Sequence, residues 1–139
     1  MSLFAWKSDY SVGNAQIDLQ HKQLFRMAGE LHSAMVNGRG TEVVEGLLDQ
    51  LVAYTCHHFA SEERLMKESG YPDYAQHHAS HEKLSGEVRE FQVRVKARKV
   101  AVTLEMMRFL RDWLDHHIRG ADKKVGAHLK ARLTAGVQR

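Results

Sequence analysis

The sequence predicts an all-α protein, an antiparallel up-down four-helix bundle with an N-terminal arm and a short C-terminal helix. Three observations lead to this prediction. The 139 residues include a single proline, so little interrupts a helical segment. Short β-branched runs bounded by turn residues, which would indicate strands, do not occur at regular spacing. Apolar residues instead recur at steps of three and four in four segments of roughly 20 residues, separated by short breaks.

The N-terminal part is expected to be an arm followed by the first helix. Residues 1–16 have no clear apolar period and contain the turn signal Gly13-Asn14, so we expect them to lie on the body of the protein. Apolar residues then recur on one face over residues 17–37, which predicts the first bundle helix. The turn-forming run at residues 37–40 ends this pattern.

The second helix is expected over residues 41–68. Thr41 has the character of an N-cap, and acidic residues follow it in the first turn. The run Ser-Gly-Tyr-Pro-Asp at residues 69–73 is the sharpest break in the sequence. Within it, Gly70 suits the end of a helix and Asp73 suits the N-cap of the next one.

Three further helices complete the prediction. The third is expected over residues 74–97, where apolar positions alternate at steps of three and four as they do in a bundle seam. The fourth is expected over residues 102–120, and a shorter C-terminal helix over 122–134, beyond Gly120. We treat residues 1–139 as a single domain, since no second domain or repeat is visible.

Composition excludes several classes of function. Twenty Lys and Arg against seventeen Asp and Glu leave a formal net charge of only +3, which does not indicate a nucleic-acid-binding surface. No apolar stretch approaches the roughly 18 residues of a membrane span, and no signal peptide is apparent. A single cysteine, Cys56, excludes an internal disulfide and a multi-thiolate metal site. We therefore expect a cytoplasmic monomer without membrane insertion.

Polar side chains interrupt the apolar faces of all four predicted bundle helices. An unpaired buried carboxylate costs several kcal/mol, a large part of the stability of about 5–15 kcal/mol that a small domain has. A bound cation would remove this cost. Imidazole with carboxylate suits iron, zinc, copper or nickel better than calcium or magnesium. The interrupting residues are His21, His58, Glu62, His77, His81 and His117.

The spacing of these residues supports a metal site but leaves its register open. His77 and His81 are one helical turn apart, so their side chains point to the same place. His58 and Glu62 have the same spacing on the second helix. His78 and Glu82 have the same four-residue spacing, so spacing alone does not exclude this pair as the metal ligands. The apolar seam of the third helix favours His77 and His81. His128 has no partner at metal-binding spacing and is expected to face solvent.

Five segments together form a specific signature. They are Asp18-Leu19-Gln20-His21-Lys22, His58-Phe59 through Glu62-Glu63 to Leu65-Met66, Gly70-Tyr71-Pro72, His77-x3-His81, and Trp113-Leu114 with His117-Ile118 and Asp122. With the arm residues 6–13, they resemble the bacterial hemerythrins over nearly the whole chain.

The resemblance implies a non-haem di-iron centre that binds O2 reversibly. One iron would take three histidines and the other two, and both would share two carboxylates and an oxo or hydroxo group. These donors are one short of filling two octahedra, so the open position for O2 is expected on the iron with two histidines. The resemblance assigns His77, His81 and His117 to the first iron, His21 and His58 to the second, and Glu62 and Asp122 to the bridges.

Asp122 is not where helical spacing alone would place a metal ligand. It follows His117 by five residues, which at 100° per residue overshoots a full turn of an α-helix by about 140°. Either a π-bulge near Arg119-Gly120 or a change of helix direction would realign it. We therefore predict a local irregularity at Gly120.

The expected surroundings of the O2 site are apolar and favour binding over catalysis. None of the expected wall residues can act as a general acid or base, and the paired Glu-x-x-His motifs of ferritin-like di-iron oxygenases do not occur. We therefore expect an oxygen carrier, storage or delivery protein rather than an enzyme. The expected wall residues are Leu24, Phe25, Phe59, Trp113, Leu114 and Ile118.

Two alternatives use the same candidate ligands. One is a di-iron peroxidase, oxidase or nitric-oxide-handling enzyme. The other is an O2 sensor that acts through a separate signalling partner. For a delivery protein, the corresponding partner would be an O2-consuming enzyme.

Overall fold

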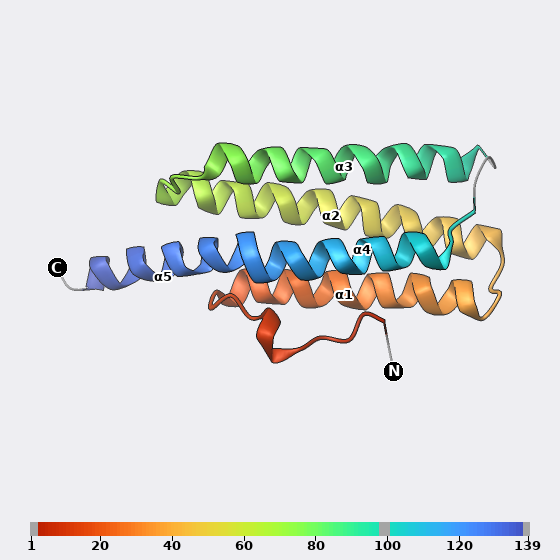
Figure 1. Cartoon of the computed structure of the whole chain (residues 1–139), viewed down its shortest axis with the longest axis horizontal. Helices are drawn as coiled ribbons and strands as arrows, with labels where there is room; N and C mark the ends of the chain where they lie inside the picture. Colours follow the sequence, from red (N-terminus) through yellow and green to blue (C-terminus); the bar gives the residue numbers. More distant parts are fainter. Residues whose placement is uncertain (1–2, 98–100, 138–139) are drawn as a thin grey trace.

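The computed structural model describes residues 3–97 and 101–137, and these form five α-helices and no strand. The first four helices run alternately in opposite directions, and α5 continues the course of α4 (Figure 1). The all-α four-helix architecture expected from the sequence is therefore confirmed. The α-helices are α1 (Ala15–Val36), α2 (Thr41–Ser69), α3 (Tyr74–Lys96), α4 (Leu104–His117) and α5 (Lys123–Val137), with a 3-10 turn η1 (Ser8–Tyr10) in the arm and a π-helical segment η2 (Ile118–Asp122) between α4 and α5.

Local sequence explains how the chain reverses between helices. Gly70 ends α2 in the left-handed conformation, with a φ of 68°, which glycine adopts without steric cost. Asp73 occupies the N-cap position of α3, but its side chain makes no capping hydrogen bond. At the start of α2 the N-cap is Gly40, with a φ of 94°, so the expected N-cap Thr41 is instead the first helical residue. These turns set the antiparallel order of the helices.

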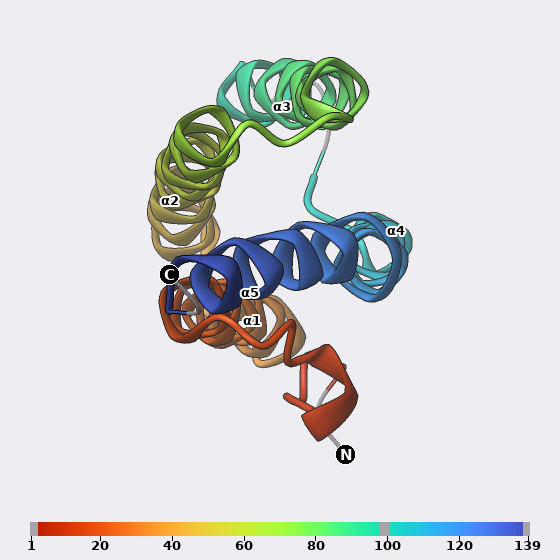
Figure 2. The same ribbon diagram turned by 90° about the vertical axis from the view of Figure 1, so that its left-hand side faces the viewer.

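The core lies along the inward faces of the helices, which surround it in the end-on view of Figure 2. Within the described residues, no helix combines the length and the apolar character that crossing a bilayer requires. Side chains that are almost completely buried come from every helix of the bundle and from the π-helical segment. Among them are Ile17, Leu24, Leu31, Met66, Leu84, Met107, Ile118 and Val125.

The N-terminal arm connects α1 to the junction of α4 and α5. Tyr10 stacks on Phe25 of α1, with the ring centroids 4.8 Å apart. The Tyr10 hydroxyl donates to Asp115 Oδ1 at 2.8 Å. Arg119 lies over the Tyr10 ring at 5.2 Å and pairs with Asp115 at 3.1 Å. The arm therefore braces the segment that leads to Asp122.

A backbone-to-backbone contact joins the arm to α5. A Cβ atom placed on Gly126 would lie 1.9 Å from the carbonyl oxygen of Val12. Because the neighbouring atom belongs to the backbone, it cannot move aside by a side-chain rotation. Only glycine permits this approach at residue 126.

Gly126→Ala is expected to push the arm away from α5 and to lower the free energy of unfolding by roughly 1–3 kcal/mol, the usual cost of overpacking. Urea unfolding followed by circular dichroism measures this change. The matched control is Gly86→Ala, at an exposed position of α3 where an added Cβ meets nothing within 4 Å. It should leave stability unchanged or raise it slightly, because alanine is the better helix former. Equal unfolding midpoints for the two variants would contradict the tight contact.

Candidate metal centre

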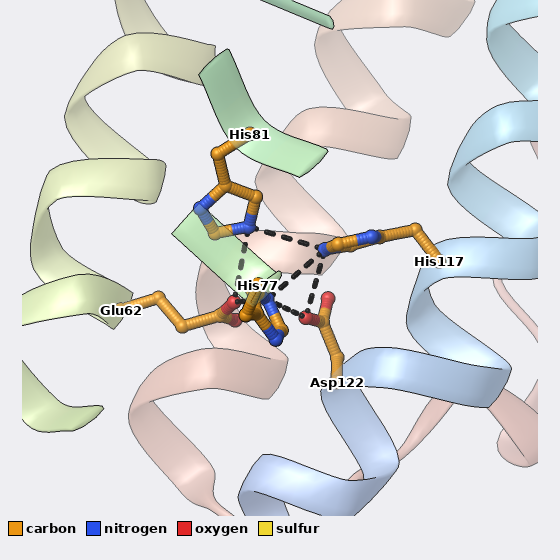
Figure 3. A group of neighbouring side chains, drawn as sticks. All are labelled: Glu62, His77, His81, His117 and Asp122. Atoms are coloured by element: carbon orange, nitrogen blue, oxygen red, sulfur yellow. Dashed lines mark hydrogen bonds and ion pairs between the residues drawn. The ribbon is translucent and has the colours of Figure 1, made fainter. Parts of the chain in front are cut away.

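Seven polar side chains from the four bundle helices and the π-helical segment meet in the interior. All are buried, with at most 8% of each residue exposed. They form two overlapping groups, each able to present its nitrogen and oxygen atoms to one point. Figure 3 shows five of the side chains pointing toward one another from α2, α3, the end of α4 and the π-helical segment. The seven are His21 on α1, His58 and Glu62 on α2, His77 and His81 on α3, His117 at the end of α4, and Asp122 at the end of η2.

The first group contains three histidines, which all turn their Nε2 atoms inward. The Nε2 atom of His117 lies 3.1 Å from that of His81 and 3.2 Å from that of His77. Glu62 Oε1 lies 2.7 Å from His77 Nε2 and 3.3 Å from His81 Nε2. Asp122 Oδ1 lies 3.0 Å from His77 Nε2 and 3.1 Å from His117 Nε2. Five donor atoms thus surround one point.

The second group contains two histidines and the remaining oxygens of the same two carboxylates. His21 Nε2 lies 3.0 Å from Asp122 Oδ2 and 3.9 Å from Glu62 Oε2. His58 Nε2 lies 3.6 Å from Glu62 Oε2. Glu62 and Asp122 therefore each turn one oxygen to the three-histidine group and the other to the two-histidine group. A carboxylate shared in this way can bridge two metal ions.

The missing hydrogen-bond partners of the two buried carboxylates are consistent with a metal centre. Within the part of the chain that the structure describes, the four oxygens of Glu62 and Asp122 have no hydrogen-bond partner. Histidine nitrogens approach them to between 2.7 and 3.9 Å, but without the geometry of a hydrogen bond. Leaving buried charged oxygens unsatisfied is costly. Nitrogen and oxygen donors directed at a common point are the arrangement that a transition-metal ion needs.

Protonation of His77 compensates the buried carboxylates in the metal-free cluster, and a metal ion would displace that proton. Burial lowers the pKa of His58 to about 4, so its imidazole is neutral near pH 7. Burial acts in the same direction on His77, but contacts with Asp122 and Glu62 raise the pKa of His77 to about 9. Burial acts to raise the pKa of both carboxyls, yet the surrounding histidines hold the pKa of Glu62 below, and that of Asp122 well below, the usual range. Both carboxylates are therefore anions in the folded protein.

The π-helical segment places Asp122 in the cluster. In a π-helix the hydrogen bonds join residues five apart, so residues five apart lie on nearly the same face. His117 immediately precedes η2 and Asp122 is its last residue, and their Nε2 and Oδ1 atoms are 3.1 Å apart. The predicted irregularity at Gly120 is confirmed. It takes the form of a π-bulge, after which the chain goes on as α5, which the end-on view shows running obliquely from α4 toward α1 (Figure 2).

Two residues outside the cluster hold the outer nitrogens of its histidines. The Nδ1–H of His58 donates to Gln20 Oε1 at 2.7 Å, and that of His81 donates to Glu63 Oε2 at 2.8 Å. Such bonds leave Nε2 free to bind a metal. Helical periodicity alone predicts no role for Gln20 or Glu63. Each is adjacent in sequence to a cluster residue, and adjacency carries no helical-face signal.

The structure also separates the register alternatives. His77 and His81 lie in the cluster, whereas the side chain of His78 is 41% exposed and bonds to Glu63. His128 was expected to face solvent, and this prediction was wrong. Its Nε2 atom lies 3.0 Å from the carbonyl oxygen of Ser69, because α5 continues α4 and packs against the end of α2.

The six residues expected to line the O2 pocket divide between two environments. Phe59 stacks on His81 with the ring centroids 3.8 Å apart, and Trp113 stacks on His117 at 4.3 Å. The Phe25 ring instead packs against arm residues, including Tyr10. That the six residues line a pocket beside the two-histidine group stays a prediction. The other three, Leu24, Leu114 and Ile118, are buried.

A protein family, several relatives and solved structures are similar to this chain. Residues 12–129 match the model of the hemerythrin HHE cation binding domain. A bacteriohemerythrin of Stenotrophomonas maltophilia (strain R551-3) is 38% identical over 133 residues, which cover 96% of this chain and 86% of that protein. The bacteriohemerythrin of Methylococcus capsulatus is 37% identical over 132 residues, which cover 94% of this chain and 100% of that protein. A crystal structure of wild-type hemerythrin matches with a TM-score of 0.86 at 36% identity, covering 90% of this chain and 96% of that one.

Glu62→Gln is expected to disturb both histidine groups at once, because it removes charge from the oxygen pair that they share. The metal-free wild-type protein should take up two Co²⁺ ions per chain and gain thermal stability from them, whereas the variant should bind fewer ions and gain less. Visible absorption and thermal unfolding during a Co²⁺ titration measure both effects. The matched control is Glu82→Gln, at an exposed position of α3. Equal Co²⁺ binding by the two variants would contradict a bridging role for Glu62.

Proposed function

This chain belongs to the hemerythrin family, and on that premise we propose that it binds O2 reversibly at two iron ions held by the seven clustered side chains. One observation carries the proposal. Each of the two carboxylates directs one oxygen to the three-histidine group and the other oxygen to the two-histidine group. In this proposal His77, His81 and His117 hold one iron, His21 and His58 hold the other, and Glu62 and Asp122 bridge both, together with an oxo or hydroxo group.

The donor set supports binding of O2 over its use to oxidise a substrate. Two ferrous ions held by these residues would supply the two electrons that reversible O2 binding requires. Five of the seven side chains are imidazoles, which donate as neutral groups, and only Glu62 and Asp122 bring negative charge. A set with so few anions stabilises highly oxidised iron less well than a carboxylate-rich set does. The chain therefore favours the reversible exchange.

The two histidine groups differ in a way that directs O2 to one side. His77, His81 and His117 leave little room around the first metal position, because three imidazoles and two carboxylate oxygens already converge there. At the second position His21 and His58 meet the other two oxygens, so one protein donor fewer is present. We place O2 on the two-histidine side for this reason.

The protein around the cluster keeps water away. Phe59 and Trp113 lie flat against the imidazoles of His81 and His117, with interplanar angles of 4° and 15°. The aromatic faces cover these rings and hold their orientation. On the side where O2 is placed, His21 and His58 are each 1% exposed, and an environment that excludes water slows the protonation and loss of bound oxygen in a reduced form. This behaviour is what a carrier, storage or delivery protein needs.

Reversible absorption changes test the proposal. Protein loaded with Fe²⁺ under argon is expected to develop a visible absorption band in air and to lose it on deoxygenation, over repeated cycles, with one O2 bound per two irons. His58→Ala should abolish the reversible band, because it removes a donor from the two-histidine side. The adjacent His57 is exposed, so His57→Ala is the matched control and should behave like the wild-type protein.

Three other outcomes would contradict O2 carriage. Consumption of O2 without recovery on deoxygenation would indicate an oxidase. Catalytic turnover of peroxide, or of nitric oxide, would indicate the corresponding enzyme using the same residues. Binding of zinc with no uptake of iron would remove the redox chemistry from the site altogether.

A further inference from the structure

Glu63 joins a buried histidine of the cluster to a histidine at the surface. Its Oε2 atom accepts the Nδ1–H of His81 at 2.8 Å, and its Oε1 atom accepts the Nδ1–H of His78 at 2.7 Å. The side chain of Glu63 is 15% exposed, that of His81 is 1% exposed and that of His78 is 41% exposed. One carboxylate on α2 thus holds two histidines of α3 from one side.

These contacts fix His81 in a single orientation. With its Nδ1–H bonded to Glu63, the neutral ring has an unprotonated Nε2 atom, which faces Glu62 Oε1 at 3.3 Å. Phe59 stacks against the same ring at 3.8 Å, almost parallel to it. The hydrogen bond sets which nitrogen carries the proton, and the stacking sets the plane of the ring. Neither depends on the metal being bound.

The two-histidine group has no comparable anion. The Nδ1–H of His58 donates to the amide oxygen of Gln20, whose amide nitrogen in turn donates to Ser61 Oγ at 3.1 Å. The Nδ1 atom of His21 has no hydrogen-bond partner among the described residues. In those residues, a bond from a cluster histidine to an anion outside the cluster occurs only at Glu63. Only the three-histidine group therefore has a negatively charged partner outside the cluster.

We propose that Glu63 is a positioning residue of the metal centre, which holds His81 in its metal-binding tautomer and makes the three-histidine side the more electron-rich of the two. The inference rests on the proposed di-iron site. An imidazole whose N–H donates to a carboxylate is a stronger donor through its other nitrogen than one that donates to an amide. Glu63 therefore strengthens metal binding through His81 and favours the oxidised state of the metal there.

Four variants separate the hydrogen bond of Glu63 from its charge. Glu63→Ala removes both and should weaken Co²⁺ binding roughly ten- to a hundredfold, the usual effect of losing such a partner. Glu63→Gln keeps an acceptor but loses the charge, so it should weaken binding less. His78→Ala leaves the bond to His81 intact and should bind Co²⁺ nearly as the wild type does. Glu82→Gln removes a charge from the same surface depression and is the matched control.

Two readouts, neither involving O2, decide the test. Competition with a chromogenic chelator gives the Co²⁺ affinity, and a redox titration under argon gives the reduction potential of the iron-loaded protein. We expect Glu63→Gln to raise the potential and Glu82→Gln to leave it nearly unchanged. Equal shifts in both variants would show a general effect of charge and overturn the proposal, as would wild-type Co²⁺ affinity in Glu63→Ala.

Folding and function are tested separately from this inference. Thermal unfolding of the metal-free proteins shows whether Glu63→Ala still folds. If it does not, the potentials of Glu63→Gln and Glu82→Gln decide the question. A protein that takes up two irons and shows the Glu63 effect but never binds O2 reversibly would overturn the proposed function alone.

Discussion

Glu62 and Asp122 are at most 1% exposed, in a core that otherwise consists largely of apolar side chains. Two anions in such a place are tolerated only if positive charge or metal compensates them, because water cannot. Around the carboxylates, His77 with its raised pKa provides positive charge in the metal-free protein, and the five histidines together provide the nitrogen donors that a compensating metal ion needs. Since the histidines come from four helices, none of these helices can shift or rotate without pulling the cluster apart. The cluster therefore constrains the packing of the whole bundle.

Several local features hold the chain in the arrangement that the cluster needs. Gly70 reverses the chain after α2, so α3 runs back and returns His77 and His81 to the level of Glu62. The π-helical segment then brings Asp122 onto the same face as His117. The arm braces this segment, because Tyr10 bonds to Asp115 on the last turns of α4. A segment more than 100 residues away in the sequence thereby supports the position of a single buried carboxylate.

The asymmetry of the centre extends beyond the residues that would bind metal. The three-histidine side has the charged partner Glu63 and two aromatic rings stacked on its imidazoles, whereas on the two-histidine side His58 has the neutral partner Gln20. Both differences act in the same direction. The first side is well filled and firmly held, and the second has fewer donors. This contrast suits the proposed centre, in which one metal would be held firmly and the other would exchange O2.

Much of this site follows from helical periodicity, which is local and can be predicted from sequence. The four-residue spacing of His58 and Glu62 places both side chains on one face, and the turn at Gly70 is equally local. Periodicity could not place Asp122, because an α-helix would have turned it away and only the π-bulge brings it in.

Interhelical contacts have no sequence period at all. The bond of Glu63 to His81, the contact of Gly126 with Val12 and the hydrogen bond that holds His128 depend on how closely two helices, or a helix and the arm, approach. The sequence by itself determined which faces of the helices carry histidine and carboxylate. Only the tertiary structure decided which partners those residues meet, because the distance between elements is set by packing of the whole core rather than by any one segment.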